Sequence, residues 1–455
     1  MIDIVASLVV VLFGGILLAA AVRNVSRLEQ RLMALSLAAH VASALAQIGI
    51  TQGIYGGGDM LNYMSEGSLV AHAFELDPRE FGPFWLDLLL QGEPSTTFPV
   101  LGAGSSTGSM VAITAALALV FRYSLFGICL AIAVAACFGK FALYRVFREV
   151  LPTPMRARIL IAILLMPSAV FWSAGVLKES LVIAGVGPLW LGIHRILRGR
   201  PVWGSILVLV GAIPIALLKS YTLFALGVGA AAWFTMDRLL SRSGRTGPVR
   251  IRPIYLIVGA ALTYASVIGL SQLFPKYSVD QMGEDLARYQ RLGVQVGGGS
   301  FYQMGDEGAM SLQKQIAFGP LAIATALFRP FVFEANNGLA LMASLEILVM
   351  TILVVQVLLR TGPRSALRAL MSTPVLFGSL VFVLAFGLGV GLATTNFGTL
   401  SRYRMPLVPF YAVVVFVLQS SVARKAAVSP PRARAAASRT PPRLGRIRRQ
   451  SRGAS

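Results

Sequence analysis

The uninterrupted apolar stretch PVLFGSLVFVLAFGLGVGLAT, residues 374–394, decides the fold class. It carries no charged residue, and it is long enough for the roughly 18 to 20 residues with which an α-helix spans the hydrocarbon core of a bilayer. Comparable runs occupy residues 4–22, 253–274 and 339–359. The sequence lacks the short alternating segments of a membrane β-barrel, so it predicts an all-α bundle of transmembrane helices.

The overall composition agrees with this interpretation. Of the 455 residues, 56% are hydrophobic and 13% are charged, and the mean hydropathy is +0.73. Soluble globular chains contain about 25% charged residues. We therefore expect a polytopic membrane protein.

The net charge of +21 is gathered in short clusters between the apolar runs. Basic loops favour the cytoplasmic side of a membrane, so we place these clusters there. They are Arg23 with Arg27 and Arg31, residues 140–158, 195–200, 238–252 and 360–368, and the tail 422–455. The tail is rich in Pro, Ala, Ser and Arg, which predicts a disordered cytoplasmic segment touching anionic lipid and not a nucleic-acid-binding module.

The same sidedness predicts about 11 crossings, with the amino terminus and two long segments, about 51–108 and 275–336, on the outer side. Residues 1–421 then form a single transmembrane domain. We expect helical hairpins at 159–194 and 203–236, and a run at 110–139 whose first half is tilted or re-entrant. Single crossings are expected at 4–22, 31–50, 254–273, 338–359, 373–393 and 404–421. The stretch 319–331 is too short to span and is expected at the outer interface.

Ionisable residues that interrupt apolar sequence all fall on the outer side under this topology. Such groups are costly at membrane depth and usually face a cavity or a partner. We therefore expect an outer-facing polar cavity. Its candidate residues are Asp59, Glu66, Lys178, Glu179, Lys219, Arg329, Glu334, Arg402 and Arg404.

Asp59 follows three glycines and precedes Tyr63 and Glu66 at helical spacing. A carboxylate here can act as general base on a hydroxyl, and Asp59 and Glu66 are our catalytic candidates. The alternative is that Asp59 caps a helix over residues 60–74, and the two interpretations are compatible.

The basic candidates suit an anionic ligand, but each also has a structural interpretation. Lys178 is a candidate phosphate ligand, whereas Glu179 beside it suits the positive end of a starting helix. Arg402 and Arg404 precede a helix expected near Pro406 and suit bidentate phosphate binding, with snorkelling to the interface as the alternative. Arg329 and Glu334 can be an internal ion pair and nothing more.

No metal site is predicted from the histidines or cysteines. His40, His72 and His194 lie far apart, and Cys129 and Cys137 share one apolar run, so neither set has the spacing of metal ligands. Two acidic pairs in the second outer segment leave a divalent cation open as a cofactor, although solvated loop charge also accounts for them. These pairs are Glu284 with Asp285 and Asp306 with Glu307.

Three segments carry a family resemblance: PSAVFWSAGVLKES (167–180), LFRPFVFEANNGLALMASLE (327–346) and NFGTLSRYRMPLVPF (396–410). They resemble segments of bacterial polytopic proteins of exopolysaccharide and cell-envelope glycan assembly, which in turn resemble the GT-C glycosyltransferase superfamily. The resemblance implies residence in the bacterial cytoplasmic membrane, with the active site facing outward. It also implies Asp59 as catalytic base. One departure is the extra helix that precedes Asp59, because the GT-C aspartate usually follows the first transmembrane helix.

In the GT-C superfamily, basic residues hold the phosphate of a polyprenyl-phosphate sugar, and the resemblance gives that role to Lys178, Arg329, Arg402 and Arg404. The leading hypothesis is therefore transfer of a sugar from a polyprenyl-linked donor to a glycan or lipid acceptor, with no nucleic-acid partner. An alternative is an oligosaccharide repeat-unit polymerase acting on lipid-pyrophosphate substrates. A second alternative is a lipid or polysaccharide transporter without catalysis, although the sequence shows no internal repeat that would favour it.

Overall fold

The computed structural model describes residues 1–92, 99–243, 317–394 and 396–428, with the last side chains described at Ser420. The crossing expected at 254–273, most of the second outer segment with its acidic pairs, and tail residues 429–455 lie outside the described residues. The described part is helical and contains no β-strand, which confirms the all-α prediction.

Seven of the described helices are long and apolar enough to cross a membrane. They are α1 (Ile2–Ala21), α2 (Arg27–Ile50) continued by a π-turn at Thr51–Tyr55, α6 (Leu125–Val150), α9 (Lys178–Leu197), α10 (Pro201–Ser243), α15 (Gly338–Thr361) and α17 (Pro374–Ala393). An eighth span results if α18 (Phe397–Tyr403) and α19 (Val408–Val428), bent by 76°, count as one. The described part of the chain is therefore a polytopic helical bundle with seven or eight helices that are suited to crossing a membrane.

Helix α10 reverses direction at Lys219, whose backbone (φ −149°, ψ 71°) is not helical. Before the reversal, Gly204 packs against Gly192 of α9, so closely that a Cβ at Gly204 would lie 2.7 Å from the Gly192 carbonyl oxygen. After it, the Trp233 ring lies 5.2 Å from that of Trp190, again on α9. Both limbs of α10 thus lie along one helix, which is the hairpin expected at 203–236.

The hairpin expected at 159–194 differs from prediction in its first limb. Instead of one continuous helix, the chain forms α7 (Arg156–Leu164) and the five-residue α8 (Pro167–Phe171), followed by a turn that leads into α9. Pro167 causes the break, because proline has no backbone N–H to continue α7 but fits the first turn of a new helix. This segment therefore has backbone groups inside the bundle whose hydrogen-bond partners come from other helices.

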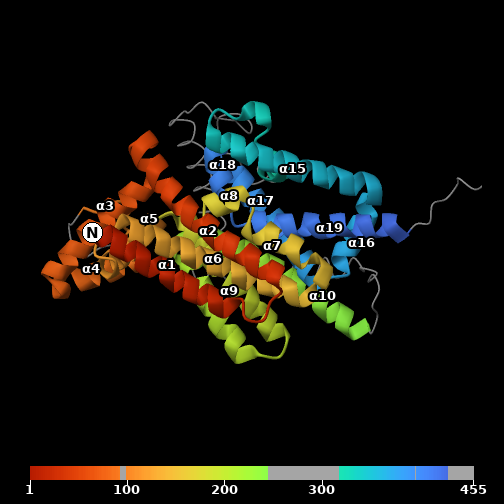
Figure 1. Cartoon of the computed structure of the whole chain (residues 1–455), viewed down its shortest axis with the longest axis horizontal. Helices are drawn as coiled ribbons and strands as arrows, with labels where there is room; N and C mark the ends of the chain where they lie inside the picture. The colour runs from red at the N-terminus through yellow and green to blue at the C-terminus, as the bar shows by residue number, and fades with distance from the viewer. Residues whose placement is uncertain (93–98, 244–316, 395, 429–455) are drawn as a thin grey trace, which may run out of the picture.

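The first outer segment folds into helices of its own. These are α3 (Asp59–Leu76) and α4 (Pro78–Leu90). The run expected at 110–139 is divided, and its first half is the short apolar helix α5 (Ser106–Val120), separate from α6. Helices α3, α4 and α5 lie together with the amino terminus at one end of the long axis of the molecule (Figure 1). Asp3 accepts a hydrogen bond from Ser124 at 2.5 Å, just before α6 begins. The amino terminus and the segment that contains Asp59 are thus at the same end of the bundle, as the predicted topology requires.

The carboxyl-terminal part begins with α14 (Gly319–Phe328), a short apolar helix that packs against the end of α17. A Cβ at Gly391 of α17 would lie 2.1 Å from the Ala322 carbonyl oxygen of α14. The amphipathic helix α16 (Pro363–Met371) and the end of α19 lie at the opposite end of the molecule from α3 (Figure 1). Helix α19 runs to Val428, past the boundary expected at 421/422.

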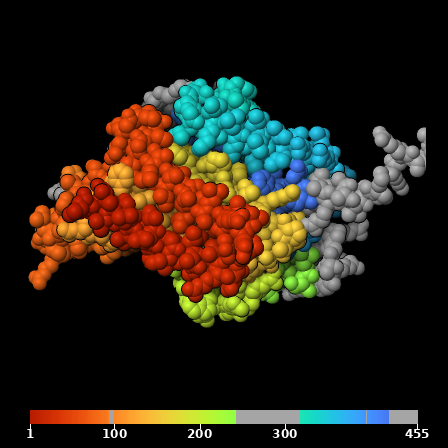
Figure 2. Space-filling model, in the orientation of Figure 1, coloured from red at the N-terminus to blue at the C-terminus, as the bar shows by residue number. Residues whose placement is uncertain are grey.

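Close backbone contacts hold the centre of the bundle together. A Cβ at Gly187 of α9 would lie 1.7 Å from the carbonyl oxygen of Gly139 on α6. Contacts of this kind between small residues are typical of transmembrane helix packing. By contrast α1, dark red in Figure 2, exposes large apolar side chains such as Leu8 and Leu12, a surface suited to lipid.

One charged residue was misplaced by the sequence analysis. Lys140 was expected in the cytoplasmic cluster 140–158. It lies on α6, and its side chain is fully buried in the helical bundle. Its neighbours Arg145 and Arg148 lie farther along the same helix, where Arg148 forms an ion pair with Glu29 of α2.

Candidate functional site

Four ionisable side chains from four helices meet near the end of the bundle that carries α3; we call them the charged cluster. Glu179 is at its centre, and its Oε1 lies 2.6 Å from Lys219 Nζ and 3.0 Å from Arg402 Nε. Arg402 Nη2 in turn lies 2.6 Å from Asp59 Oδ2. The cluster therefore joins residues that the sequence predicted would share one polar site.

Each member of the charged cluster lies where a helix begins, bends or ends. Asp59 and Glu179 are in the first turns of α3 and α9, where the helix dipole favours a negative charge. Lys219 is the reversal point of α10, and Arg402 is in the last turn of α18, where a cation is favoured. The cluster is thus built from helix ends, and Gly58 (φ 121°) supplies the backbone turn that starts α3 at Asp59.

Exposure separates Asp59 from the rest of the cluster. Its side chain is 45% exposed, whereas Arg402 is 19% exposed and Glu179 is fully buried. The interpretation of Asp59 as a helix cap is wrong: Gly58 holds the cap position without a side-chain bond, and the Asp59 carboxylate binds Arg402 instead. Asp59 is therefore the cluster carboxylate that a ligand can reach.

Lys178 lies beside the cluster and holds the start of α5. Its ammonium group donates to Ser106 Oγ at 3.0 Å and to Thr107 Oγ1 at 2.9 Å. A cation between the amino-terminal ends of α5 and α9 faces two positive helix ends, an arrangement that a bound anion would relieve. Lys178, Lys219 and Arg402 give this region three cations against the two carboxylates of Asp59 and Glu179.

Aromatic rings line the same region. Lys219 Nζ lies 3.7 Å from the centre of the Tyr403 ring. The Arg402 guanidinium lies 5.7 Å from the centre of the same ring. Tyr63 is buried one helical turn after Asp59, and its ring centre is 5.9 Å from Lys178 Nζ. Burial, and then the nearby Asp59 charge, raise the pKa of Tyr63 well above its ordinary value, so its hydroxyl stays a neutral hydrogen-bond donor.

Arg329, Glu334 and Arg404 form a second group, in which Arg404 follows the cluster residue Arg402 by two positions. Arg329 and Glu334 make an ion pair, which is the structural alternative considered for them. Arg404 is fully buried and donates to the Arg329 carbonyl oxygen. Arg404 and Arg329 therefore hold the segment before α15 in place, and they do not join the charged cluster through an ion pair among the described residues.

Glu66 also lies apart from the charged cluster. It is in the middle of α3, and its Oε2 accepts a hydrogen bond from the Leu101 backbone N–H at 3.3 Å. It makes no ion pair with the cluster within the described part of the chain. Glu66 therefore stabilises the loop before α5 through its hydrogen bond with Leu101.

The sequence analysis missed several residues that the structure places around the cluster. Tyr63 has the i+4 spacing from Asp59 that puts both on one helix face, so a pattern was present. Ser106, Thr107 and Tyr403 had no such pattern, because they reach the cluster only through tertiary packing. Glu179 Oε2 is buried without a hydrogen-bond partner among the described residues, so it keeps the capacity to accept one.

Two other features bear on cofactors and ligands. Among the described residues, no three His, Cys, Asp or Glu side chains are grouped so as to hold a metal ion.

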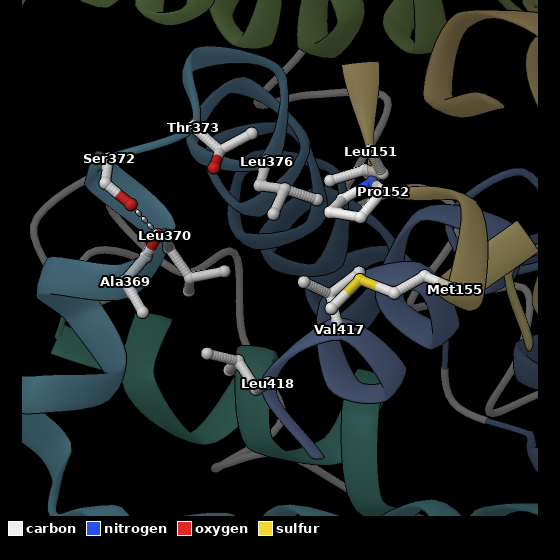
Figure 3. Close-up of a pocket in the computed structure, with 10 residues that line it drawn as sticks. All are labelled: Leu151, Pro152, Met155, Ala369, Leu370, Ser372, Thr373, Leu376, Val417 and Leu418. Atoms are coloured by element: carbon white, nitrogen blue, oxygen red, sulfur yellow. Dashed lines mark hydrogen bonds between the residues drawn. The ribbon is translucent and has the colours of Figure 1, made fainter. Parts of the chain in front are cut away.

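A mainly apolar pocket lies at the other end of the bundle, lined by Leu151, Met155, Leu370, Leu376, Val417 and their neighbours (Figure 3). The Ser372 hydroxyl near its edge already donates to the Ala369 carbonyl oxygen at 2.7 Å. The charged cluster is therefore the better candidate for chemistry.

The site thus combines an exposed carboxylate, three cations and a buried carboxylate in a membrane-type helical bundle. The chain matched no protein-family model, no curated protein and no solved structure.

Proposed function

We propose that the protein is a membrane glycosyltransferase that moves a sugar from a polyprenyl-phosphate donor to a glycan or lipid acceptor. The observation that carries the proposal is the charged cluster, in which exposed Asp59 lies 2.6 Å from a largely buried arginine. Lys219 joins the same cluster through Glu179, and Lys178 precedes Glu179 at the start of α9. A carboxylate next to a cationic anion site is what transfer from a lipid phosphate requires. The apolar exterior of the bundle gives a lipid-linked substrate a route to it through the bilayer.

In the proposed reaction, the acceptor hydroxyl oxygen attacks the anomeric carbon of the sugar. The bond from that carbon to the phosphate oxygen breaks, and Asp59 takes the hydroxyl proton. The phosphate leaves as an anion, and Lys178, Lys219 and Arg402 stabilise its charge. All atoms and charges are accounted for without a metal ion, and a divalent cation stays open as a cofactor.

Arg402 gives the proposed reaction an order of events. Its guanidinium lies 2.6 Å from Asp59 Oδ2, so the carboxylate already has a partner before substrate binds. A donor phosphate competes with Asp59 for the guanidinium, and this competition frees the carboxylate to act as base. The donor therefore binds before Asp59 becomes active.

The proposal includes a place in the cell. We propose that the protein lies in a bacterial cytoplasmic membrane with the cluster facing outward, in the assembly of cell-envelope glycan or exopolysaccharide. This rests on the predicted sidedness of the basic loops and on the resemblance of the three sequence segments to the GT-C superfamily.

Substitution of Asp59 tests the proposal. Purified protein in nanodiscs, supplied with polyprenyl-phosphate sugars and screened acceptors, should transfer sugar, and Asp59→Asn should reduce turnover by about 10² to 10⁴ because the general base is lost. Glu66→Gln is the matched control on the same helix, since its amide oxygen still accepts from Leu101. Wild-type turnover in Asp59→Asn would remove Asp59 from the mechanism.

A repeat-unit polymerase is the second candidate, and the ion pair of Asp59 with Arg402 is compatible with it, because a carboxylate that stays paired does not have to act as a base. In that case the cations bind a lipid pyrophosphate and no single carboxylate is essential. Activity retained in Asp59→Asn but lost in Arg402→Ala would support the polymerase. A third candidate, a transporter, would show substrate flux in proteoliposomes without any covalent product in the same preparations.

A further inference from the structure

Helix α8 lies inside the bundle and is held at both ends by buried side chains from other helices. At its start, Glu346 of α15 accepts hydrogen bonds from the Ser168 backbone N–H at 2.8 Å and from the Ser168 hydroxyl at 2.6 Å. Farther along, Lys140 of α6 donates to the Ala169 carbonyl oxygen at 2.7 Å and to Ser173 Oγ at 2.9 Å. Gln47 of α2 donates to the Phe171 carbonyl oxygen.

These contacts match the polarity of a helix. The Glu346 carboxylate meets a free N–H at the amino-terminal end of α8, and the Lys140 ammonium meets a free carbonyl near the other end. A helix of five residues has few hydrogen bonds of its own, and no water is available in the middle of a membrane to satisfy the rest. We call Lys140, Glu346 and Gln47 the α8 clamp.

The third proton of Lys140 is satisfied as well. His40 Nδ1 lies 2.7 Å from the Ser36 carbonyl oxygen, which can only accept, so Nδ1 carries the hydrogen. The other ring nitrogen, Nε2, is then an acceptor, and it lies 3.1 Å from Lys140 Nζ. All three donors of Lys140 therefore have partners, and two of these partners belong to α8 and the turn after it.

The turn that the clamp holds leads directly into the charged cluster. After α8 the chain passes through residues 172–177 and then starts α9 with Lys178 and Glu179. The Ser180 hydroxyl reaches back to the Trp172 carbonyl oxygen at 3.3 Å. The turn has little room to move, because a Cβ at Gly175 would lie 2.1 Å from Gln47 Oε1.

We infer that Lys140, Glu346 and Gln47 are positioning residues: they fix α8 and its following turn, and through them the first turn of α9, so that Lys178 and Glu179 keep their places in the anion site. The effect on α8 depends on the geometry alone. The effect on ligand binding rests in addition on the proposed function. The two effects can be measured separately on the same variants.

The first measurement is hydrogen–deuterium exchange of the full-length protein in detergent micelles. Lys140→Met and Glu346→Gln should each speed the exchange of amides in residues 166–177 about tenfold or more, because buried polar groups of the segment lose their partners. Amides of α10 and α17 should keep their wild-type rates. Gln419→Leu is the control, since it breaks a partly buried polar pair with Gln356 on α15 and α19, away from α8. Unchanged exchange at 166–177, or an equal increase in all helices, would overturn the inference.

Cys129 supplies a second readout that needs no new label site. It is fully buried, and the backbone of Val176, in the turn that the clamp holds, lies beside its sulfur. Maleimide labelling of Cys129, read by peptide mass spectrometry, should be several-fold faster in Lys140→Met than in Gln419→Leu. Equal rates in the two variants would count against the clamp even if one of them is less stable overall.

The last measurement separates this inference from the proposed function. Binding of polyprenyl phosphate in nanodiscs should weaken about tenfold in both clamp variants, and Arg402→Ala should weaken it without altering exchange at residues 166–177. If Arg402→Ala binds the lipid phosphate normally, the proposed anion site is wrong while the exchange result still stands. If the clamp variants exchange faster but bind normally, the positioning role is wrong.

Discussion

The charged cluster and the α8 clamp both place ionisable side chains inside a membrane-type bundle, but their partners differ. In the clamp, Lys140 and Glu346 bind backbone groups and hydroxyls of one broken segment, and every donor of Lys140 is satisfied. In the cluster, charged side chains bind one another: one oxygen of Glu179 is shared by two cations, and its other oxygen has no hydrogen-bond partner among the described residues.

This difference separates groups that complete the fold from groups that are available to a ligand. A side chain that satisfies backbone groups in a helix break replaces the missing helical hydrogen bonds, so its loss is felt by the segment it holds. A set of mutually paired charges with an exposed member can exchange partners when an anion enters. Substitutions in the clamp should therefore act on stability first, and substitutions in the cluster on ligand binding first.

Both regions depend on the contact between α6 and α9, so breaking that contact should give the largest effect. Gly187→Ala places a Cβ 1.7 Å from the Gly139 carbonyl oxygen, and the two helices must move apart. We expect a loss of about 3 kcal/mol or more in the free energy of unfolding, at the upper end of overpacking effects. Lys140 and Glu179 lie on these two helices, so the clamp and the cluster should fail together.

The matched control for this prediction is Gly15→Ala. Gly15 is also in the interior of a helix, but a Cβ there meets no atom within 4 Å. Alanine is the better helix former by about 1 kcal/mol, so this variant should be as stable as wild type or slightly more so. Denaturation in mild detergent, followed by circular dichroism, measures both variants. Equal stability of the two would show that α6 and α9 do not pack as closely as described.

The next effect concerns coupling within the cluster. Glu179 and Lys219 are 6% exposed or less and lie 2.6 Å apart. Removing Glu179 leaves Lys219 as a buried charge without its carboxylate, and removing Lys219 leaves Glu179 with Arg402 as its remaining cation. We expect Glu179→Gln and Lys219→Met each to cost about 2 to 4 kcal/mol, and the double variant to cost about 1 to 3 kcal/mol less than the sum. A double-mutant cycle of unfolding free energies measures this term. Strict additivity would mean that the two side chains do not form a pair.

The fold could be predicted to the extent that hydrophobic patterning determines it. Long apolar runs and basic loops were enough to predict an all-α bundle and the reversal near Lys219. These patterns could not show that Lys140 is buried. It is close in sequence to the basic residues Arg145 and Arg148, and its partners on α8 come from a different part of the chain. The patterns also could not show that the segment after Arg156 is broken, although Pro167 marks the position.

For the site, the sequence identified residue types and a side of the membrane. The structure brings Asp59, Glu179, Lys219 and Arg402 together, places Lys178 beside them and leaves Glu66 apart, while the chemical roles stay predictions. Local rules misjudged Asp59, because a capping preference of about 1 kcal/mol is smaller than the attraction of a nearby arginine that the sequence alone does not place. The role of Glu346 could not be predicted, because a single acidic residue in an apolar helix forms no recognisable motif.

The smallest effect concerns the pair of Arg329 and Glu334. This pair shares features with both the charged cluster and the α8 clamp, because it is partly exposed and also helps to hold the segment before α15. Partial burial tends to raise the pKa of Glu334, but hydrogen bonds from Arg329 and from the Phe331 backbone outweigh it and lower the pKa below 4.5. A carboxylate whose pKa is lower in the folded state stabilises the protein above its unfolded pKa. That contribution is lost as the pH falls through the folded pKa.

We therefore expect the wild-type protein to lose about 0.5 to 1 kcal/mol of stability from this pair as the pH falls from neutral through the folded pKa of Glu334, a value limited by solvent screening. Glu334→Gln should be less stable than wild type at pH 7 by that amount, and the difference should shrink as the pH falls. Thermal unfolding of both proteins across this range measures the difference. A constant difference at all pH values would show that Glu334 acts through packing and not through its charge, and the pair would then belong with the α8 clamp as a purely structural contact.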